Sequence, residues 1–142
     1  MREGSALEKQ DMSFPVEHLI NQATIARKNA YTPYSHFPVG AAVLTTTGEV
    51  YTGCNIENSS YGATCCAERV ALFKAVSQGH RDIWGIAVVA GSQEPVPPCG
   101  ICRQVMIELA PQAVVAMANL EGKREVRTVA ELLPSPFGGG FL

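Results

Sequence analysis

Three cysteines and one glutamate have the types and the spacing that a catalytic metal centre needs. Cys99 and Cys102 are three residues apart, so their thiols share one face of a helix, and Cys66 lies two residues before Glu68. Three thiolates on one zinc ion leave a fourth position open for water, as catalytic zinc sites require. A carboxylate beside that position can carry the water's proton to a substrate and to a leaving amine. The sequence therefore predicts a zinc-dependent hydrolase with Glu68 as its proton carrier.

A structural zinc site is the alternative interpretation of the same cysteines. Such a site needs a fourth ligand, which Cys65 or Cys54 could supply. Cys65 adjoins Cys66, which makes shared chelation awkward, and Cys54 ends a predicted strand. Both are more typical of small core residues. Disulfides are not expected in a reducing compartment, and an odd count of five cysteines leaves one unpaired.

The charge on the predicted centre has to be balanced by its surroundings. Zinc with three thiolates carries a net negative charge, which makes its bound water less acidic. Cys66 and Cys99 each begin a predicted helix, and a helix N-terminus stabilises a thiolate. Arg69 could donate hydrogen bonds to a thiolate sulfur and draw charge from it. We therefore predict that Arg69 does not bind the metal ion itself but adjusts its Lewis acidity by hydrogen bonding to a ligand sulfur.

The composition points to a small uncharged ligand rather than a nucleic acid. The 142 residues are 46% hydrophobic and 17% charged, with a net charge of −2 and a pI near 5.9. No run of Lys and Arg is available to neutralise a phosphate backbone. The low charged fraction is also typical of chains that bury surface against partner subunits.

We expect residues 1–13 to form a flexible leader and residues 14–142 a single domain. The first dozen residues are polar and charged, without the apolar stretch of a signal peptide. No run of about 18 apolar residues is available to cross a membrane. These features predict a cytoplasmic location with no membrane partner.

Hydrophobic periodicity and chain breakers divide the sequence into alternating helices and strands. Pro15 suits the first turn of a helix, and the prolines at 33 and 38 prevent its continuation. Strand–helix–strand recurs twice, which predicts an α/β fold with a partly parallel sheet covered by helices. We predict helices at 15–29, 66–78, 99–109 and 129–133, a polar loop at 55–64, and strands at 39–46, 50–54, 83–90, 113–117 and 126–129.

Four segments resemble motifs of the cytidine deaminase family, and the resemblance covers nearly the whole of residues 15–137. They are YSHFPVG at 34–40, CNIEN at 54–58, CAER at 66–69 and PCGICRQ at 98–104. The zinc deaminase signature places a ligand two residues before a Glu and a Pro-Cys-x-x-Cys later, here with Cys66 where the signature has His. This resemblance implies a three-layer α-β-α fold with a mixed five-stranded sheet, a homotetramer, and hydrolytic deamination of cytidine and deoxycytidine in pyrimidine salvage.

The resemblance also implies roles that residue types alone do not establish. It makes Cys66, Cys99 and Cys102 the zinc ligands and Glu68 the proton shuttle. Without the motifs, Phe37 would be taken as a core residue, Asn55 as a turn residue and Glu57 as a solvated charge. Within them, the ring of Phe37 stacks on the pyrimidine, and Asn55 and Glu57 bind the ribose hydroxyls. The remaining implied contacts are the backbone of Ala67 with the base, and Tyr61 and Phe137 reaching a neighbouring subunit's site.

Three other functions compete with this interpretation. A deaminase of another aminopyrimidine, such as blasticidin S, would share the Cys-x-Glu arrangement, but Asn55 and Glu57 favour a ribose. A zinc-stabilised binding module that has lost catalysis would have no need of Glu68 over an open metal position. A nucleic-acid editor would need a basic channel that the acidic composition does not offer.

Overall fold

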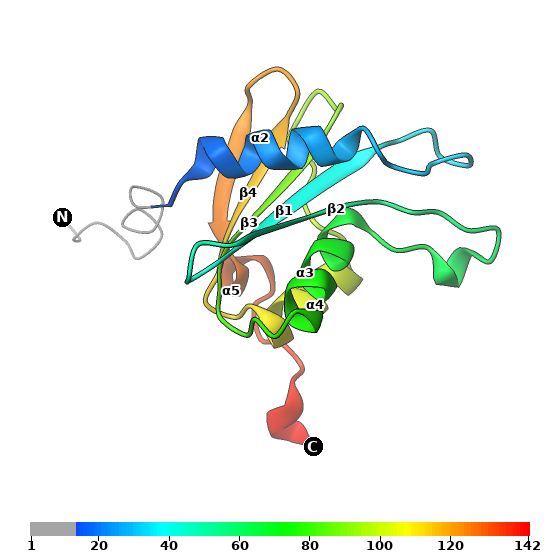
Figure 1. Cartoon of the computed structure of the whole chain (residues 1–142). Helices are drawn as coiled ribbons and strands as arrows, with labels where there is room; N and C mark the ends of the chain where they lie inside the picture. The colour runs from blue at the N-terminus through cyan, green and yellow to red at the C-terminus, as the bar shows by residue number, and fades with distance from the viewer. Residues whose placement is uncertain (1–13) are drawn as a thin grey trace.

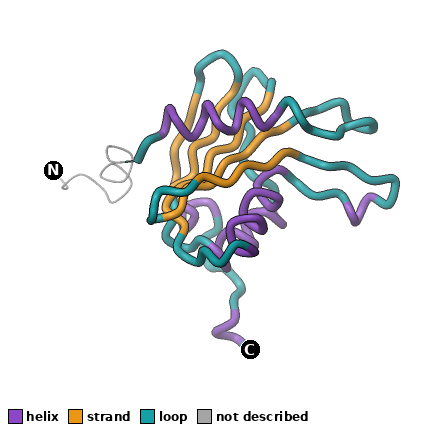
Figure 2. Tube along the Cα trace, in the orientation of Figure 1, coloured by secondary structure: helices purple, strands orange, loops and turns teal. Residues whose placement is uncertain are grey.

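A five-stranded mixed sheet organises the structure, a computed structural model that describes residues 14–142 (Figures 1 and 2). The strand order is β2-β1-β3-β4-β5; only β3 and β4 pair in parallel, and the other neighbours are antiparallel. The predicted mixed five-stranded sheet is confirmed, whereas the predicted leader at 1–13 lies outside the described residues. The strands are β1 (Val39–Thr45), β2 (Val50–Cys54), β3 (Ile83–Ala90), β4 (Val114–Asn119) and β5 (Arg124–Thr128).

Helices cover both faces of the sheet, which makes the three layers expected from the sequence. Helix α2 (Val16–Arg27) lies across one face, and α3 (Ala67–Ser77), α4 (Gly100–Leu109) and α5 (Val129–Leu132) lie on the other (Figure 1). Each face has its own apolar core. Leu19 and Val89 are buried in the core under α2, and Leu72 and Met106 in the opposite core. Central strands covered on both sides explain the continuous apolar runs in the sequence.

Most predicted boundaries agree with the structure to within one or two residues, but the β4–β5 hairpin is longer than predicted. The pairing extends to Ala118 and Arg124. Asn119 closes the turn, because its buried Oδ1 accepts hydrogen bonds from the backbone N–H groups of Glu121 and Lys123 at 3.0 and 2.9 Å. The predicted loop at 55–64 contains one short 3₁₀ turn, η1 (Tyr61–Ala63), and the tail contains another, η2 (Gly139–Phe141). No helix within residues 14–142 is long and apolar enough to cross a membrane.

Strand direction brings the two cysteine-bearing helices together. Both β2 and β3 are antiparallel to β1, so they run the same way and end at the same edge of the sheet. The loop after β2 leads to α3, and the loop after β3 leads to α4. Helix N-termini therefore meet beyond the carboxyl ends of these strands, where α/β folds place their sites.

Gly53 allows α3 to lie directly against β2. A Cβ atom at this position would come within 2.6 Å of both the Ala67 carbonyl oxygen and the Ala71 nitrogen. Real Cβ atoms do not approach backbone atoms that closely. The absence of a side chain on Gly53 thus fixes the depth at which the first turn of α3, with Glu68, sits on the sheet.

Candidate metal centre

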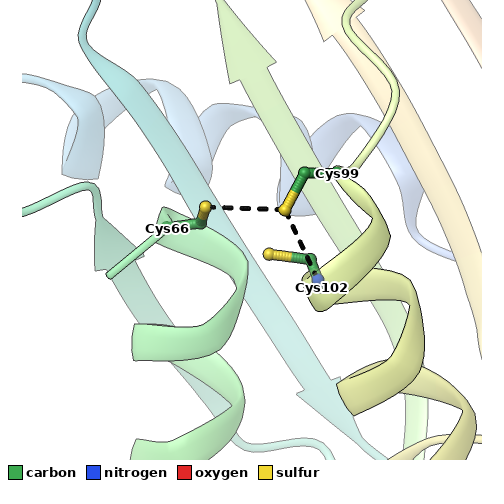
Figure 3. A group of neighbouring side chains, drawn as sticks. All are labelled: Cys66, Cys99 and Cys102. Atoms are coloured by element: carbon green, nitrogen blue, oxygen red, sulfur yellow. Dashed lines mark hydrogen bonds between the residues drawn. The ribbon is translucent and has the colours of Figure 1, made fainter. Parts of the chain in front are cut away.

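The thiols of Cys66, Cys99 and Cys102 converge between the N-termini of α3 and α4 (Figure 3). All three sulfur atoms lie within 4.8 Å of one another, and the Sγ atoms of Cys66 and Cys99 are 3.8 Å apart. Tetrahedral zinc with Zn–S bonds of about 2.3 Å requires sulfur atoms about 3.8 Å apart. Neither Cys54 nor Cys65 belongs to this group. The three donors therefore fit a zinc ion, and residues 14–142 offer no fourth His, Cys, Asp or Glu ligand within this group.

The local backbone explains why these thiols face one another. Cys66 is the N-cap residue of α3 and Cys99 that of α4, so both sulfurs lie at positive helix ends. The Sγ of Cys99 accepts a hydrogen bond from the backbone nitrogen of Cys102 at 3.5 Å. Cys102 itself is fully buried one turn into the helix. Each ligand is thus held by regular backbone rather than by a loose loop.

Thiolate character is built into the cluster. Hydrogen bonding from the Cys102 thiol and from Arg69 lowers the pKa of Cys66 to about 5, although burial opposes this shift. The Nη2 atom of Arg69 donates to the Cys66 Sγ at 3.3 Å, as the sequence predicted for this arginine. Hydrogen bonding to Cys66, followed by burial, raises the pKa of Cys102. These surroundings favour the thiolate form of Cys66, which is the form that binds a metal ion.

Glu68 lies in the first turn of α3 and is 4% exposed. Burial raises the pKa of its carboxyl to about 7, and the Cys66 thiolate adds to the shift. A carboxyl group with a pKa near neutrality can both accept and release a proton. Glu68 thus has the properties of a general acid–base group, and its position beside the thiols makes it available to a metal-centred reaction.

A cavity of about 210 Å³ brings Glu68 and two of the thiols together with part of the predicted ligand pocket. Phe37, Asn55 and Ala67, to which the motif resemblance assigns contacts with a nucleoside, are among its lining residues. The lining is mainly apolar, with few polar groups, which is the usual character of a small-molecule site. Its other lining residues are Val39, Cys66, Glu68, Val88, Val96, Pro97 and Cys99.

Glu57 is two residues after Asn55, which lines this cavity, but Glu57 itself is not among the lining residues. Its Oε1 accepts hydrogen bonds from the backbone nitrogens of Tyr34 and Ser35 at 2.9 and 3.1 Å, and its Oε2 accepts one from the Ser35 hydroxyl. These bonds, led by that of the Ser35 side chain, lower the pKa of Glu57. The carboxylate therefore holds the loop before β1, an attachment that sequence reasoning did not anticipate.

The two residues predicted to reach a neighbouring subunit are both largely exposed on their own chain. Tyr61 is 77% exposed and meets the ring of Tyr34 edge to face. Phe137 is 58% exposed and stacks on Phe141. The tail that carries Phe137 projects away from the sheet beyond α3 and α4 (Figure 1). Neither ring lines the cavity that contains Glu68.

Arg103 is a supporting residue that the sequence analysis missed. Its Nε donates to the carbonyl oxygen of Pro98 at 2.7 Å, and its Nη1 donates to that of Leu132 at 2.8 Å. It therefore ties the residue before Cys99 to the end of α5. Its position directly after Cys102 in the PCGICRQ segment was the feature of the sequence that could have indicated this supporting role.

A three-thiol centre beside a buried glutamate, on a three-layer α-β-α fold, defines the class of zinc-dependent deaminases. The family model of the cytidine and deoxycytidylate deaminase zinc-binding region matches residues 15–118, and the chain belongs to this family.

Individual relatives agree with the family assignment. The chain is 58% identical to the cytidine deaminase of Halalkalibacterium halodurans over 120 residues, which are 84% of this chain and 91% of that protein. The crystal structure of cytidine deaminase from Burkholderia pseudomallei superposes with a TM-score of 0.84 at 49% identity, covering 85% of this chain and 98% of that one. The blasticidin-S deaminase of Bacillus cereus is 35% identical over 124 residues, 82% of this chain and 87% of that protein.

Proposed function

We propose that residues 14–142 act as one zinc-dependent domain that hydrolyses cytidine and deoxycytidine to uridine, deoxyuridine and ammonia. The observation that carries this proposal is the cavity in which the buried Glu68 lies beside Cys66 and Cys99. The relatives named cytidine deaminase support the substrate class. Such an activity would serve pyrimidine salvage.

The chemistry divides between a metal ion and Glu68. When bound by Cys66, Cys99 and Cys102, zinc would supply a Lewis acid that makes a water molecule nucleophilic near pH 7. The Glu68 carboxylate would carry the two protons of the water in turn: the first to the ring nitrogen, and the second, from the oxygen now bonded to the ring carbon, to the departing amino group. In the overall reaction, water and the amidine group of the base give a carbonyl group and ammonia. Glu68 is 4% exposed, and this burial raises the pKa of its carboxyl above the usual range, which suits a group that both accepts and releases a proton.

Phe37, Ala67, Asn55 and Glu57 would recognise the nucleoside. The exposed ring of Phe37 offers a stacking face in the cavity, and the backbone of Ala67 offers polar groups beside Glu68. Asn55 and Glu57 would bind the ribose hydroxyls through hydrogen-bonding positions that their contacts within the loop do not use. The 3′ hydroxyl is common to ribose and deoxyribose, so such contacts would accept both nucleosides.

A homotetramer with composite sites is part of the proposal. Tyr61 and Phe137 are exposed in the single chain and would cover a neighbouring subunit's cavity. The outer surfaces of α3 and α4 also expose Phe73 and Ile101, at 46% and 63%, which is typical of helix faces that meet a partner. We place the enzyme in the cytoplasm, where the ligand thiols would stay reduced.

Blasticidin S is the second candidate substrate, because the Bacillus cereus relative is named for it. The proposed ribose contacts favour a nucleoside instead. A metal-stabilised binding module has no use for a buried acid–base group such as Glu68. The net charge of −2 opposes a polynucleotide substrate.

Substrate comparison tests the proposed function. The purified chain would be incubated separately with cytidine, deoxycytidine, cytosine, cytidine monophosphate and blasticidin S, and both ultraviolet absorbance and released ammonia would be followed. We expect turnover of the two nucleosides and very little of cytosine, since it lacks the sugar. Efficient deamination of the monophosphate or of blasticidin S, with cytidine left unchanged, would contradict the proposal.

A further inference from the structure

Side chains bind both polar backbone groups of Phe37, the residue whose ring lines the cavity. Its N–H donates to the Oγ of Ser35 at 3.1 Å, and its carbonyl oxygen accepts from the Nδ2 of Asn55 at 2.9 Å. Asn55 also accepts a hydrogen bond from the backbone nitrogen of Val39 through Oδ1 at 2.8 Å. The peptide units on either side of Phe37 are therefore fixed, and with them the direction in which its side chain leaves the backbone.

The Ser35 hydroxyl connects Phe37 to Glu57. The same oxygen that accepts from the Phe37 N–H donates to the Glu57 carboxylate. Glu57 in turn accepts from the backbone nitrogens of Tyr34 and Ser35, so three hydrogen bonds attach this turn to one carboxylate. Bonds to an ionised acceptor are stronger than those between neutral groups.

The backbone of His36, between Ser35 and Phe37, has a conformation that needs support from neighbouring contacts. Its φ angle is 55°, in the left-handed region that a residue with a side chain adopts only at a cost. That conformation allows the peptide chain to turn back so that the Phe37 N–H meets the Ser35 oxygen two residues earlier. The hydrogen bonds around Ser35 offset the cost.

We propose that Ser35 is a positioning residue that links the ribose-binding carboxylate of Glu57 to the base-stacking ring of Phe37. The inference rests on the proposed nucleoside activity and deepens it. Ser35 does not line the cavity, so it acts through its two neighbours and not on the substrate. Sugar and base are then recognised by one connected unit, and a ligand that engages Glu57 meets a ring already in place.

This role predicts a defect in binding and not in chemistry. Removing the hydroxyl leaves the Phe37 N–H and one oxygen of Glu57 without their partner, so the turn relaxes and the ring loses its fixed place. Glu68 and the thiols lie on α3 and α4, which are separate elements. A loss that affects ground state and transition state alike raises KM and leaves kcat unchanged.

Steady-state kinetics on cytidine would test the link with the full-length, zinc-loaded protein. Ser35→Ala is expected to raise KM about tenfold, because a hydrogen bond to a charged group is lost, with kcat and zinc content unchanged. Ser35→Thr keeps the hydroxyl and is expected to recover most of the affinity. Ser77→Ala is the matched control, since it removes an exposed hydroxyl at the far end of α3 and is expected to behave as wild type.

A double variant separates positioning from a local structural effect. If Ser35 acts by placing the ring, Ser35→Ala should add little to the KM of Phe37→Ala, whereas independent effects would multiply. An unchanged KM in Ser35→Ala, a Ser35→Thr variant as impaired as Ser35→Ala, or full additivity with Phe37→Ala would overturn the inference. A wild-type protein inactive on cytidine would remove the proposed function, and this inference with it.

Discussion

Arg69 donates a hydrogen bond from Nη2 to the Sγ of Cys66 across 3.3 Å, one turn along α3 from the sulfur. Its Nε is buried and has no hydrogen-bond partner within residues 14–142. Within the described residues the guanidinium has the Cys66 sulfur as its hydrogen-bond partner and forms no ion pair with a carboxylate. A permanent positive charge beside a ligand sulfur draws electron density from it, which strengthens the Lewis acidity of a bound metal ion.

Arg69→Ala should lower turnover and loosen the metal together. Losing a partner behind a metal ligand typically reduces metal affinity or activity by about 10- to 100-fold, and we expect kcat to fall within this range. The measurements are kcat on cytidine and the rate at which a chromogenic chelator extracts zinc. Arg81→Ala is the control, because Arg81 is exposed and, among residues 14–142, donates to the Val76 carbonyl at the other end of α3. Wild-type kcat and wild-type zinc release in Arg69→Ala would exclude this role.

Gly53→Ala should destabilise the fold and disturb the metal centre. The new Cβ would meet the backbone of α3 at 2.6 Å, and neither backbone can move without shifting the helix. Overpacking of this kind costs about 3 kcal/mol of the free energy of unfolding, at the upper end of the usual range. Chemical denaturation would measure the loss, and metal analysis would show weaker zinc retention because the moved helix carries Cys66 at its start.

Gly139→Ala serves as the control for that substitution. A Cβ at Gly139 would meet no described atom within 4 Å, and its backbone does not require a glycine. We expect its unfolding free energy to lie within about 0.5 kcal/mol of wild type. Equal stability of the two variants would show that the contact between β2 and α3 is not as close as described.

Removing the tail after Pro134 should raise KM for cytidine while zinc is retained. The reason is that Phe137 would be lost from the neighbouring subunit's cavity, whereas the thiols and Glu68 remain. Mixing the truncated chain with full-length Glu68→Gln subunits should restore some sites of low KM, because intact tails would cover intact metal centres. Sedimentation would accompany the kinetics, and a fully active monomer would contradict the shared site.

The metal centre could be predicted because its residues fall in two short segments, each at the start of a helix. Cys99 and Cys102 are one helical turn apart, and Cys66 and Glu68 lie together at the start of α3, so local geometry groups each pair. Cys66 and Cys99 are 33 residues apart, and the two pairs meet because β2 and β3 end at the same edge of the sheet. The apolar runs of β3 and β4 likewise indicated buried strands. The β4–β5 hairpin was underestimated because its end depends on the Asn119 side chain, which no hydrophobic pattern records.

The loop around Phe37 could not be predicted, since it depends on contacts across the chain. Glu57 lies 22 residues from Ser35, and its carboxylate is used by backbone nitrogens that every residue possesses. The left-handed conformation of His36 could not be predicted either, because histidine is only enriched in that region and most histidines have negative φ angles. Motif resemblance named Phe37, Asn55 and Glu57, but only the structure connects Glu57 to Phe37 through Ser35 and Asn55 to Phe37 directly.

Zinc content and cytidine turnover, measured on the same preparations of wild type and Glu68→Gln, test the central claim most directly. Glutamine keeps the size of the side chain but cannot carry a proton. We predict about one zinc per chain in both proteins, from a site of three thiolates, and a kcat in Glu68→Gln lower by a factor of about 10² to 10⁴. Glu121→Gln, on the exposed β4–β5 turn, should match wild type. A metal-free wild type with full activity, or a Glu68→Gln variant with near wild-type turnover, would contradict a mechanism in which Glu68 carries protons at a thiolate-held zinc.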